Sequence, residues 1–575
     1  MNVYEKNMFL SSYKDFFRGE FQMHGRYNFP GKSRFHRFLS WFLLAFMAIF
    51  MLTFASKQPF WFDELFSIGV VHNSDAVSIC KVALEGDVHP PLFHLIVSLF
   101  YRVMPYGEAY LLLLPVAFVI GGIVVLGKTG RVIGGEDLGF FTLCVAATSS
   151  ILVRQGGWEL RSYSMLFCFS SVTLLYYAKR CKEETNMNIV FYGISLTLLL
   201  HTHYFGAILA LFYGLMDLCL FLRKKIAFKC ILSYLLAGLS FVPWFILVFV
   251  YSTLDLSSFW ALPPDFTAPI LTIAYLLSNS IICCFFFGAG FLAILFGAIR
   301  KPEEKQNNAE SYILRCLPGG ILWVIAFVFC YSKFINPGGG MYVNRYFFVI
   351  LPHVFLITAY AAVAMCNALA NKSASLRMPL RCFLLLLLLL VGAQSCYLSV
   401  IQQYDPYRDI AEYLSKDGKA HSRDSLTITT DHEKAVRGWL AYYFVKRGYE
   451  IPRNMAYIPE KKADLNHYQA SLLHVFSNDG KTNARILTAE RLLEYSRIYL
   501  LGELPSGLRN AVEQNYVLEE TLFRPQPPNL SNSGFIQARF KLIRFLKNMM
   551  GFNSAPPADS SGSAGRLKIY TKRQP

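Results

Sequence analysis

The chain has 575 residues, of which 54% are hydrophobic and 16% are charged, and its formal net charge is +17. So apolar a composition excludes a soluble enzyme and indicates a polytopic membrane protein. A high net positive charge is also typical of nucleic-acid-binding proteins. Here, however, Lys and Arg cluster in short segments between apolar runs, as membrane topology requires. We therefore expect no nucleic-acid partner.

The first 37 residues are mostly polar and basic, and the first apolar run follows them at 38–56. We interpret this run as a signal anchor behind a cytoplasmic tail (1–37), because a cleaved signal peptide would start closer to the N-terminus. Thirteen cysteines are present, and their spacing forms neither a disulfide framework nor a metal-binding knuckle.

Twelve apolar stretches follow one another along the chain. They cover 38–56, 91–104, 108–127, 138–153, 164–178, 189–201, 204–222, 229–251, 270–299, 314–331, 346–366 and 382–400. A span needs roughly 17 to 25 residues, and the stretch at 91–104 is short and contains Arg102. If it does not cross, every basic cluster between spans falls on one side, as the positive-inside rule requires. We expect about 11 to 13 transmembrane helices within 38–400, eleven being favoured, with the N-terminus cytoplasmic.

Five polar loops then share the outer face of the membrane. They are the first external loop (57–90), "RQGGWELRSY" (154–163), "HTHY" (201–204), "DLSSFWALPPDF" (255–266) and "NPGGGMYVNRY" (336–346). Taken singly, each is as easily an ordinary connecting loop. Together they contain acids, histidines, arginines and aromatic residues, which favours a common site.

The sequence becomes polar after Ser399, and 401–575 is predicted to be an extracytoplasmic soluble α/β domain. Strands are expected at 425–430, 471–477, 497–502, 515–523 and 566–573, and helices at 433–446 and 489–495.

The ordered set "WFDE" (61–64), "HPPLFHL" (89–95), "ELRSY" (159–163), "HTHY" and "VNRYF" (343–347) resembles the GT-C superfamily of membrane glycosyltransferases. The resemblance is to the family 39 branch, which includes protein O-mannosyltransferases and aminoarabinose transferases. It implies a GT-C fold and transfer of a sugar from a polyprenyl-phosphate donor to a protein, lipid or glycan acceptor on the outer face. The compact first loop favours the bacterial inner membrane as the location.

The resemblance makes Asp63 the catalytic base, with Glu64 orienting the acceptor or binding a metal. Attack on a glycosyl phosphate needs a carboxylate to accept the acceptor's proton, and cations to hold the departing phosphate. One carboxylate suffices because phosphate leaves as an anion, so inversion by single displacement is expected. The alternative is that Asp63 caps a helix beginning near Leu65.

Substrate binding is assigned to residues in the other motifs. His89, held extended by the following Pro90 and Pro91, is expected to contact phosphate or sugar, whereas His94 is expected to be a packed side chain. Arg161 is a candidate phosphate ligand, and Tyr163 is expected to stack on sugar or headgroup. Glu159 is also a substrate-binding candidate, and an internal ion pair between Glu159 and Arg161 is the alternative role for these two residues.

Two further motifs complete the candidate site. His203 is a substrate-binding candidate, and His201, His203 and Glu64 are weak candidates for a divalent metal, the only cofactor considered. Arg345 suits a lipid phosphate, because guanidinium binds phosphate in a bidentate fork. Tyr346 and the glycines 338–340 beside it suggest a gate, and an interfacial Arg/Tyr anchor is the alternative.

Two other classes of function remain open. A transporter or flippase of lipid-linked glycan would carry ionisable residues in mid-span and an inverted repeat. A non-catalytic scaffold would keep the fold while its outer domain binds a partner.

Overall fold

The computed structural model describes residues 32–55, 60, 62–71, 74–86, 89–103, 108–251, 261, 263–299, 309–337, 340–372, 377–402, 407–430, 452, 455–458, 492–501, 504, 506–522 and 567–573. The chain divides into two compact units. The membrane unit comprises Met1–Ala55 and Asn73–Val400, and the C-terminal unit comprises Ser56–His72 and Ile401–Pro575.

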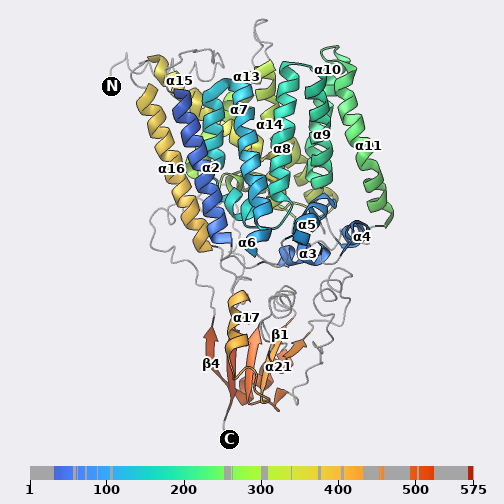
Figure 1. Cartoon of the computed structure of the whole chain (residues 1–575), viewed down its shortest axis with the longest axis vertical. Coiled ribbons are helices and arrows are strands. Elements are labelled where there is room, and N and C mark those ends of the chain that lie inside the picture. The colour runs from blue at the N-terminus through green and yellow to red at the C-terminus, as the bar shows by residue number, and fades with distance from the viewer. Residues whose placement is uncertain are drawn as a thin grey trace. The chain divides into compact units, whose positions relative to one another are not determined.

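The membrane unit is built of helices that run side by side (Figure 1). Its helices are α2 (Lys32–Ala55), α4 (Ala76–Gly86), α5 (Leu92–Val103), α6 (Glu108–Leu111), α7 (Leu113–Ala147), α8 (Tyr163–Lys182), α9 (Asn186–Thr202), α10 (Tyr204–Leu222), α11 (Phe228–Tyr251), α12 (Ala268–Leu276), α13 (Ile281–Ile299), α14 (Ala309–Cys330), α15 (Leu351–Lys372) and α16 (Arg377–Gln402). Three irregular turns connect some of them, namely η1 (Leu152–Gly157), η4 (Tyr331–Ile335) and η5 (Asn344–Ile350).

Seven of the described helices are long and apolar enough to cross a membrane, and the bent pair α12–α13 makes an eighth. Helices α8 and α9 run beside them (Figure 1). The chain is therefore an integral, multi-pass membrane protein. Helix α5 has 12 residues and spans about 18 Å, so it is too short to cross, as predicted.

Helix α7 folds back on itself at Gly134 and Gly135. Both residues leave helical geometry, and Gly135 has a φ of 81°, which a residue without a Cβ adopts at little cost. The arms 113–133 and 136–147 then pack closely, since a Cβ on Gly139 would lie 2.7 Å from the carbonyl oxygen of Gly127. Only a chain reversal brings these two residues together, so α7 is a helical hairpin.

The apolar stretch 270–299 was expected to be one span, and the structure shows two helices in it with a sharp bend between them. Helices α12 and α13 meet at 114° across a break of four residues. Ser278 and Asn279 in this break have φ values of 58° and 53°, a left-handed conformation that stops the helix. The hydroxyl of Ser278 accepts a hydrogen bond from the backbone N–H of Ile151 at 3.3 Å, which fixes the break against the start of η1.

An ion pair holds several spans together at the end of the bundle opposite to His203. Arg180 in the last turn of α8 pairs with Asp217 of α10, and both side chains are almost completely buried. Tyr234 of α11 donates a hydrogen bond of 2.6 Å to the same carboxylate. The guanidinium of Arg180 also lies over the ring of Tyr192 of α9, 4.6 Å from its centroid. One charged pair therefore links α8, α9, α10 and α11.

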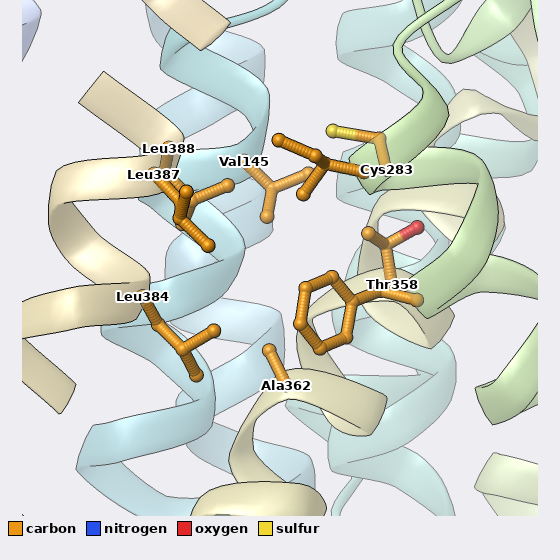
Figure 2. A pocket seen from close by; sticks show the side chains of 9 residues that line it. Val145, Cys283, Thr358, Ala362, Leu384, Leu387 and Leu388 are labelled. Carbon is orange, nitrogen blue, oxygen red and sulfur yellow. The ribbon is translucent and has the colours of Figure 1, made fainter. Parts of the chain in front are cut away.

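A small apolar pocket lies between α7, α13, α15 and α16 (Figure 2). Its lining is hydrocarbon apart from Cys283 and the hydroxyl of Thr358, which donates to the carbonyl of Val354 at 2.8 Å. None of the site residues predicted above lines this pocket.

The C-terminal unit contains a five-stranded sheet of order β2-β1-β3-β5-β4. Its elements are α3 (Phe62–Val71), α17 (Tyr407–Lys416), β1 (Ser425–Thr430), β2 (Met455–Ile458), β3 (Arg497–Leu501), α21 (Ser506–Asn515), β4 (Tyr516–Leu522) and β5 (Leu567–Lys572). Strands β2, β1 and β3 pair in parallel, and β3, β5 and β4 pair antiparallel. The structure confirms the α/β class and the strands predicted at 425–430, 497–502, 515–523 and 566–573.

Alternating apolar residues of the strands form the core of this sheet. The core is composed of Leu426, Ile428, Leu492, Ile498, Leu500, Leu504, Val512 and Tyr516. Strand β2 and helices α17 and α21 were not predicted. The predicted helix at 433–446 and strand at 471–477 lie outside the described residues, and the helix at 489–495 lies partly outside them.

Candidate functional site

Four aromatic side chains from distant parts of the membrane unit meet in one group, the His/Tyr cluster. His89 precedes α5, Tyr163 begins α8, His203 separates α9 from α10, and Tyr346 belongs to η5. The ring centroid of His203 lies 4.5 Å from that of His89 and 5.0 Å from that of Tyr346. Tyr163 lies 6.1 Å from Tyr346 and 6.4 Å from His89. The structure thus brings together residues from four of the five loops that were predicted to share the outer face, and much of the fifth (255–266) lies outside the described residues.

The backbone places His89 by means of the two prolines that follow it. The backbone N–H of Leu95 donates to the carbonyl of Pro91 at 2.9 Å, so helical hydrogen bonding starts directly after the prolines. His89 therefore stays outside the helix, as expected, and its side chain is buried in the cluster. His94 is also buried, on α5, which agrees with its predicted role as a packed side chain.

His203 interrupts what would otherwise be one long helix. Its φ and ψ of −163° and 142° are extended, and its ring Nδ1 accepts a hydrogen bond of 3.1 Å from the backbone N–H of Phe205. The side chain thus caps the N-terminus of α10 in the way that Asp or Asn often does. Because Nδ1 accepts, the neutral ring carries its proton on Nε2 and can only donate there.

This tautomer argues against His203 as a metal ligand. A ligand nitrogen must be unprotonated, and the only unprotonated nitrogen of the ring already holds the cap of α10. His201 points elsewhere, since its Nε2 lies 3.4 Å from the hydroxyl of Ser240 and its ring packs on Phe241 of α11. Among the described residues, no three His, Cys, Asp or Glu side chains are grouped to hold a metal.

Arg345 lies beside the cluster, with its guanidinium 5.7 Å from the centroid of the Tyr163 ring. Hydrogen bonds fix the backbone around it. Thr272 of α12 donates to the side chain of Asn344 at 2.8 Å, and Ser170 of α8 donates to the carbonyl of Val349 at 2.5 Å. Segment η5 is therefore anchored on two helices. Gly338 and Gly339 of the proposed gate lie outside the described residues.

Glu159 and Arg161 follow η1 and are both buried. Two glycines let η1 approach its neighbours, since a Cβ on Gly156 would lie 2.8 Å from Val119 of α7 and one on Gly157 would overlap Met51 of α2. The indole N–H of Trp158 donates to the carbonyl of Met51 at 2.9 Å and locks this packing. A π-type turn such as η1 is frequent at functional sites.

Sequence reasoning missed Arg154 and Tyr275. Arg154 stands in the quoted motif "RQGGWELRSY" but was given no role, although it lies near Glu159 and near Tyr275 of α12. Burial lowers the pKa of Arg154, but a guanidinium remains charged at neutral pH. Its place in a loop rich in charged residues was the available signal. Tyr275 offered none, since it stands within an apolar stretch.

Asp63 and Glu64 lie in the first turn of α3, in the C-terminal unit. Because α3 begins at Phe62, Asp63 is a helical residue and not the cap of a helix near Leu65, so that alternative is wrong. Two acids in a first turn are stabilised by the positive end of the helix dipole. Glu64 is buried and Asp63 is half-buried. Their catalytic roles stay predictions.

No family model matches the chain, and no curated protein matches it. Among solved structures, the chain is similar to ArnT from Cupriavidus metallidurans bound to undecaprenyl phosphate, with 13% identity, a TM-score of 0.49 and coverage of 84% of this chain and 96% of that one. It is similar to the Archaeoglobus fulgidus oligosaccharyltransferase in complex with Zn and sulfate, with 10% identity, a TM-score of 0.42 and coverage of 92% and 88%. It is also similar to AglB from the same organism in complex with an inhibitory peptide and a dolichol-phosphate, with 11% identity, a TM-score of 0.43 and coverage of 94% and 89%. All these TM-scores are below 0.5, so the proposals below rest on this chain's own residues.

Proposed function

We propose that this protein is a glycosyltransferase that moves a sugar from a polyprenyl-phosphate donor to a protein, lipid or glycan acceptor at the outer face of the membrane. The observation that carries this proposal is the convergence of His89, Tyr163, His203 and Tyr346 at one end of the spans. Arg345 adjoins this group. A membrane-edge site that combines hydrogen-bond donors, arginine and tyrosine suits a ligand with an anionic headgroup, a sugar and an apolar tail.

In the proposed reaction, Asp63 accepts the proton of an acceptor hydroxyl while the hydroxyl oxygen attacks the anomeric carbon. The bond from that carbon to the phosphate oxygen breaks, and the bonding electrons leave with the polyprenyl phosphate. Arginine charge stabilises the departing phosphate, which is the largest charge to develop. His203, protonated at Nε2, contributes a neutral hydrogen-bond donor. No step requires a metal.

The chemistry of the buried charges supports a transferase over a transporter. A transporter is expected to line its path with ionisable residues at mid-span. Of the described residues, Arg180 and Asp217 pair with each other, and His353 of α15 is hydrogen-bonded at 2.7 Å to the hydroxyl of Tyr213 of α10. Each of these groups has a hydrogen-bonded partner on another helix, which suits a structural role.

Mass spectrometry of lipid-linked sugars and surface glycans in a deletion strain tests this function. Loss of one glycan modification, with accumulation of its polyprenyl-linked donor, is expected. Complementation with Asp63→Asn should leave transfer about 10² to 10⁴ times slower, the usual range for loss of a general base. Asp75→Asn is the matched control, because Asp75 is exposed at the start of α4 and Asn also caps helices. Unchanged glycans and lipid-linked sugars in the deletion strain would refute the proposal.

A further inference from the structure

The loop that joins α10 to α11 is strongly basic. Its cations form what we call the basic loop, and all four are exposed: Arg223, Lys224, Lys225 and Lys229. Residues 218–254 include no Asp or Glu, so the sequence supplies no counter-charge on either side of the loop. Because α10 begins next to His203 and ends at Leu222, the basic loop lies at the end of the bundle opposite to the His/Tyr cluster.

Other cations at this end of the bundle are balanced by carboxylates. The pairs are Lys182 with Glu310, Arg131 with Glu136, and Arg381 with Asp137. By contrast, the side chains at 223–225 have no ion-pair or hydrogen-bond partner among the described residues. Lys229 bonds to neutral groups, the carbonyl of Glu184 and the side chain of Asn186. The positive-inside rule explains why basic residues gather at this end, but not why one loop keeps its charge unbalanced.

The backbone holds Lys224 in a conformation that lysine rarely adopts. The N–H of Lys224 donates to the carbonyl of Phe221 at 2.8 Å, and the N–H of Lys225 donates to that of Leu220 at 2.9 Å. These two bonds form a Schellman motif, which ends a helix with one left-handed residue, usually glycine. Here that residue is Lys224, with a φ of 55°. A lysine is strained at this position and a glycine is not, which points to a use for the lysine side chain.

Exposed apolar side chains adjoin these cations. Leu222 is 71% exposed and Phe228 is 56% exposed, and the ring of Phe228 lies 5.8 Å from that of Phe221. Helix α11 continues this apolar surface from Phe228 along the edge of the bundle, where only 17% of its most apolar window is buried (Figure 1). Its exposed residues include Leu232, Leu235, Leu236 and Leu239. Cations therefore meet a hydrocarbon-facing surface at the level where a lipid headgroup meets its acyl chains.

Compensation of the helix dipole does not account for this loop. The C-terminus of α10 carries about half an elementary negative charge, which a single cation offsets. Four cations gather here, and they repel one another unless an anion lies among them. A lipid phosphate supplies that anion, and Arg223 offers it a planar fork of donors.

We propose that the basic loop binds the anionic headgroup of a membrane phospholipid in the leaflet at this end of the bundle. The phosphate lies among the cations, and the acyl chains lie against Leu222 and Phe228. This lipid site is separate from sugar transfer, which is proposed for the opposite end. Because the headgroup neutralises the loop, the lipid should also stabilise the folded protein.

Binding of phosphatidylglycerol to the full-length protein in a neutral detergent tests the proposal, with phosphatidylcholine as the neutral lipid. Native mass spectrometry measures the bound lipid, and thermal unfolding measures its effect. The protein should retain phosphatidylglycerol at concentrations at which it retains no phosphatidylcholine, and phosphatidylglycerol should raise the unfolding temperature. Lys224→Gln should weaken phosphatidylglycerol binding about fivefold, and neutralisation of all three residues at 223–225 should weaken it about a hundredfold.

Lys182→Gln is the matched control for Lys224→Gln. It removes one positive charge at the same end of the bundle, but from a residue that a carboxylate already balances. Binding of phosphatidylglycerol should stay within twofold of the native value. If Lys182→Gln weakens binding as much as Lys224→Gln does, the lipid responds to net charge alone, and the proposed site is wrong.

Lys224→Gly separates the charge of this residue from its backbone conformation. Glycine keeps the left-handed turn without strain, so this variant should unfold at a higher temperature than the native protein when no phosphatidylglycerol is present. It should nevertheless bind phosphatidylglycerol as weakly as Lys224→Gln. Native-like binding by Lys224→Gly would show that the lysine side chain does not hold the lipid.

Two further outcomes would overturn the proposal. One is equal binding of phosphatidylglycerol and phosphatidylcholine by the native protein, or native-like phosphatidylglycerol binding by the variant neutralised at 223–225. The other concerns glycerol phosphate, which has the charge of the headgroup without the chains. If glycerol phosphate binds as tightly as phosphatidylglycerol, the loop takes a free anion and a lipid occupant is contradicted.

Discussion

The imidazole rings of His89 and His203 meet edge to face with their centroids 4.5 Å apart. His89 reaches this position because α5 is too short to cross the membrane and remains at the end of the bundle where α9 gives way to α10. His203 reaches it because its extended backbone breaks the helix there. The contact therefore depends on two interruptions of apolar sequence, one at a Pro-Pro pair and one at a histidine that caps its own helix.

Replacement of either histidine by alanine should lower sugar transfer by about ten- to a hundredfold, since each removes a polar group from one packed cluster. The double variant should lose less than the product of the single losses, because the two rings are in contact. His201→Ala is the control, as this side chain faces Ser240 and Phe241. The measurement is sugar transfer in isolated membranes. If His201→Ala lost as much activity as His203→Ala, the assignment of His203 to the substrate site would be contradicted.

Substitutions should separate the two roles of His203, which caps α10 through Nδ1 and is proposed to donate a hydrogen bond to the substrate from Nε2. His203→Asn keeps an oxygen that can accept from the backbone of Phe205, so the free energy of unfolding should change little. His203→Ala loses the cap and should be less stable by about 0.5 to 2 kcal/mol. Both variants lack the Nε2–H donor and should transfer sugar equally poorly. Thermal unfolding in detergent measures stability, and full activity of His203→Asn would show that only the cap matters.

Two glycines of α10 offer a matched pair of substitutions near this histidine. A Cβ on Gly206 would lie 2.5 Å from the carbonyl oxygen of Leu199, and backbone cannot move aside as a side chain can. A Cβ on Gly214 would meet only the ring of Tyr234, at 3.4 Å. Gly206→Ala should therefore cost about 1 to 3 kcal/mol and displace His203, with loss of transfer. Gly214→Ala should leave the unfolding temperature and the activity nearly unchanged. Equal effects of the two substitutions would argue against the close approach of Gly206 to Leu199.

Sequence reasoning predicted the multi-pass helical architecture and the meeting of four of the loops because both follow from local patterns. Basic residues mark one end of each span, and motif residues mark the other. The bend at Ser278 and Asn279 was missed because long apolar runs flank it and neither residue is a glycine or proline, although the polar "SNS" (278–280) was an available signal, since Asn is enriched at positive φ. Arg154 and Tyr275 were missed for a related reason. Their association depends on that bend and on the hydrogen bonds of Thr272 and Ser278, and no local pattern encodes a contact of this kind.

The buried pair of Arg180 and Asp217 gives a stability prediction that is independent of the proposed activity. Asp217→Leu leaves the Arg180 charge buried without its carboxylate, and it also removes the acceptor of the Tyr234 hydroxyl. Removing one partner of a buried pair costs about 3 to 5 kcal/mol, whereas replacing both by apolar residues is often much cheaper. The single variant should therefore unfold at a clearly lower temperature than the native protein.

The variant with both Arg180→Met and Asp217→Leu should recover much of this loss, because no isolated charge remains in the bundle. Some cost persists, since Tyr234 and Tyr177 lose their acceptor. Surface pairs behave differently, so Arg131→Met is the control: its partner Glu136 is 58% exposed, and water replaces the lost contact. The unfolding temperatures of the native protein and of the three variants are measured in one detergent. A double variant less stable than Asp217→Leu would mean that Arg180 stabilises the helices chiefly through its stacking on Tyr192 and Tyr177.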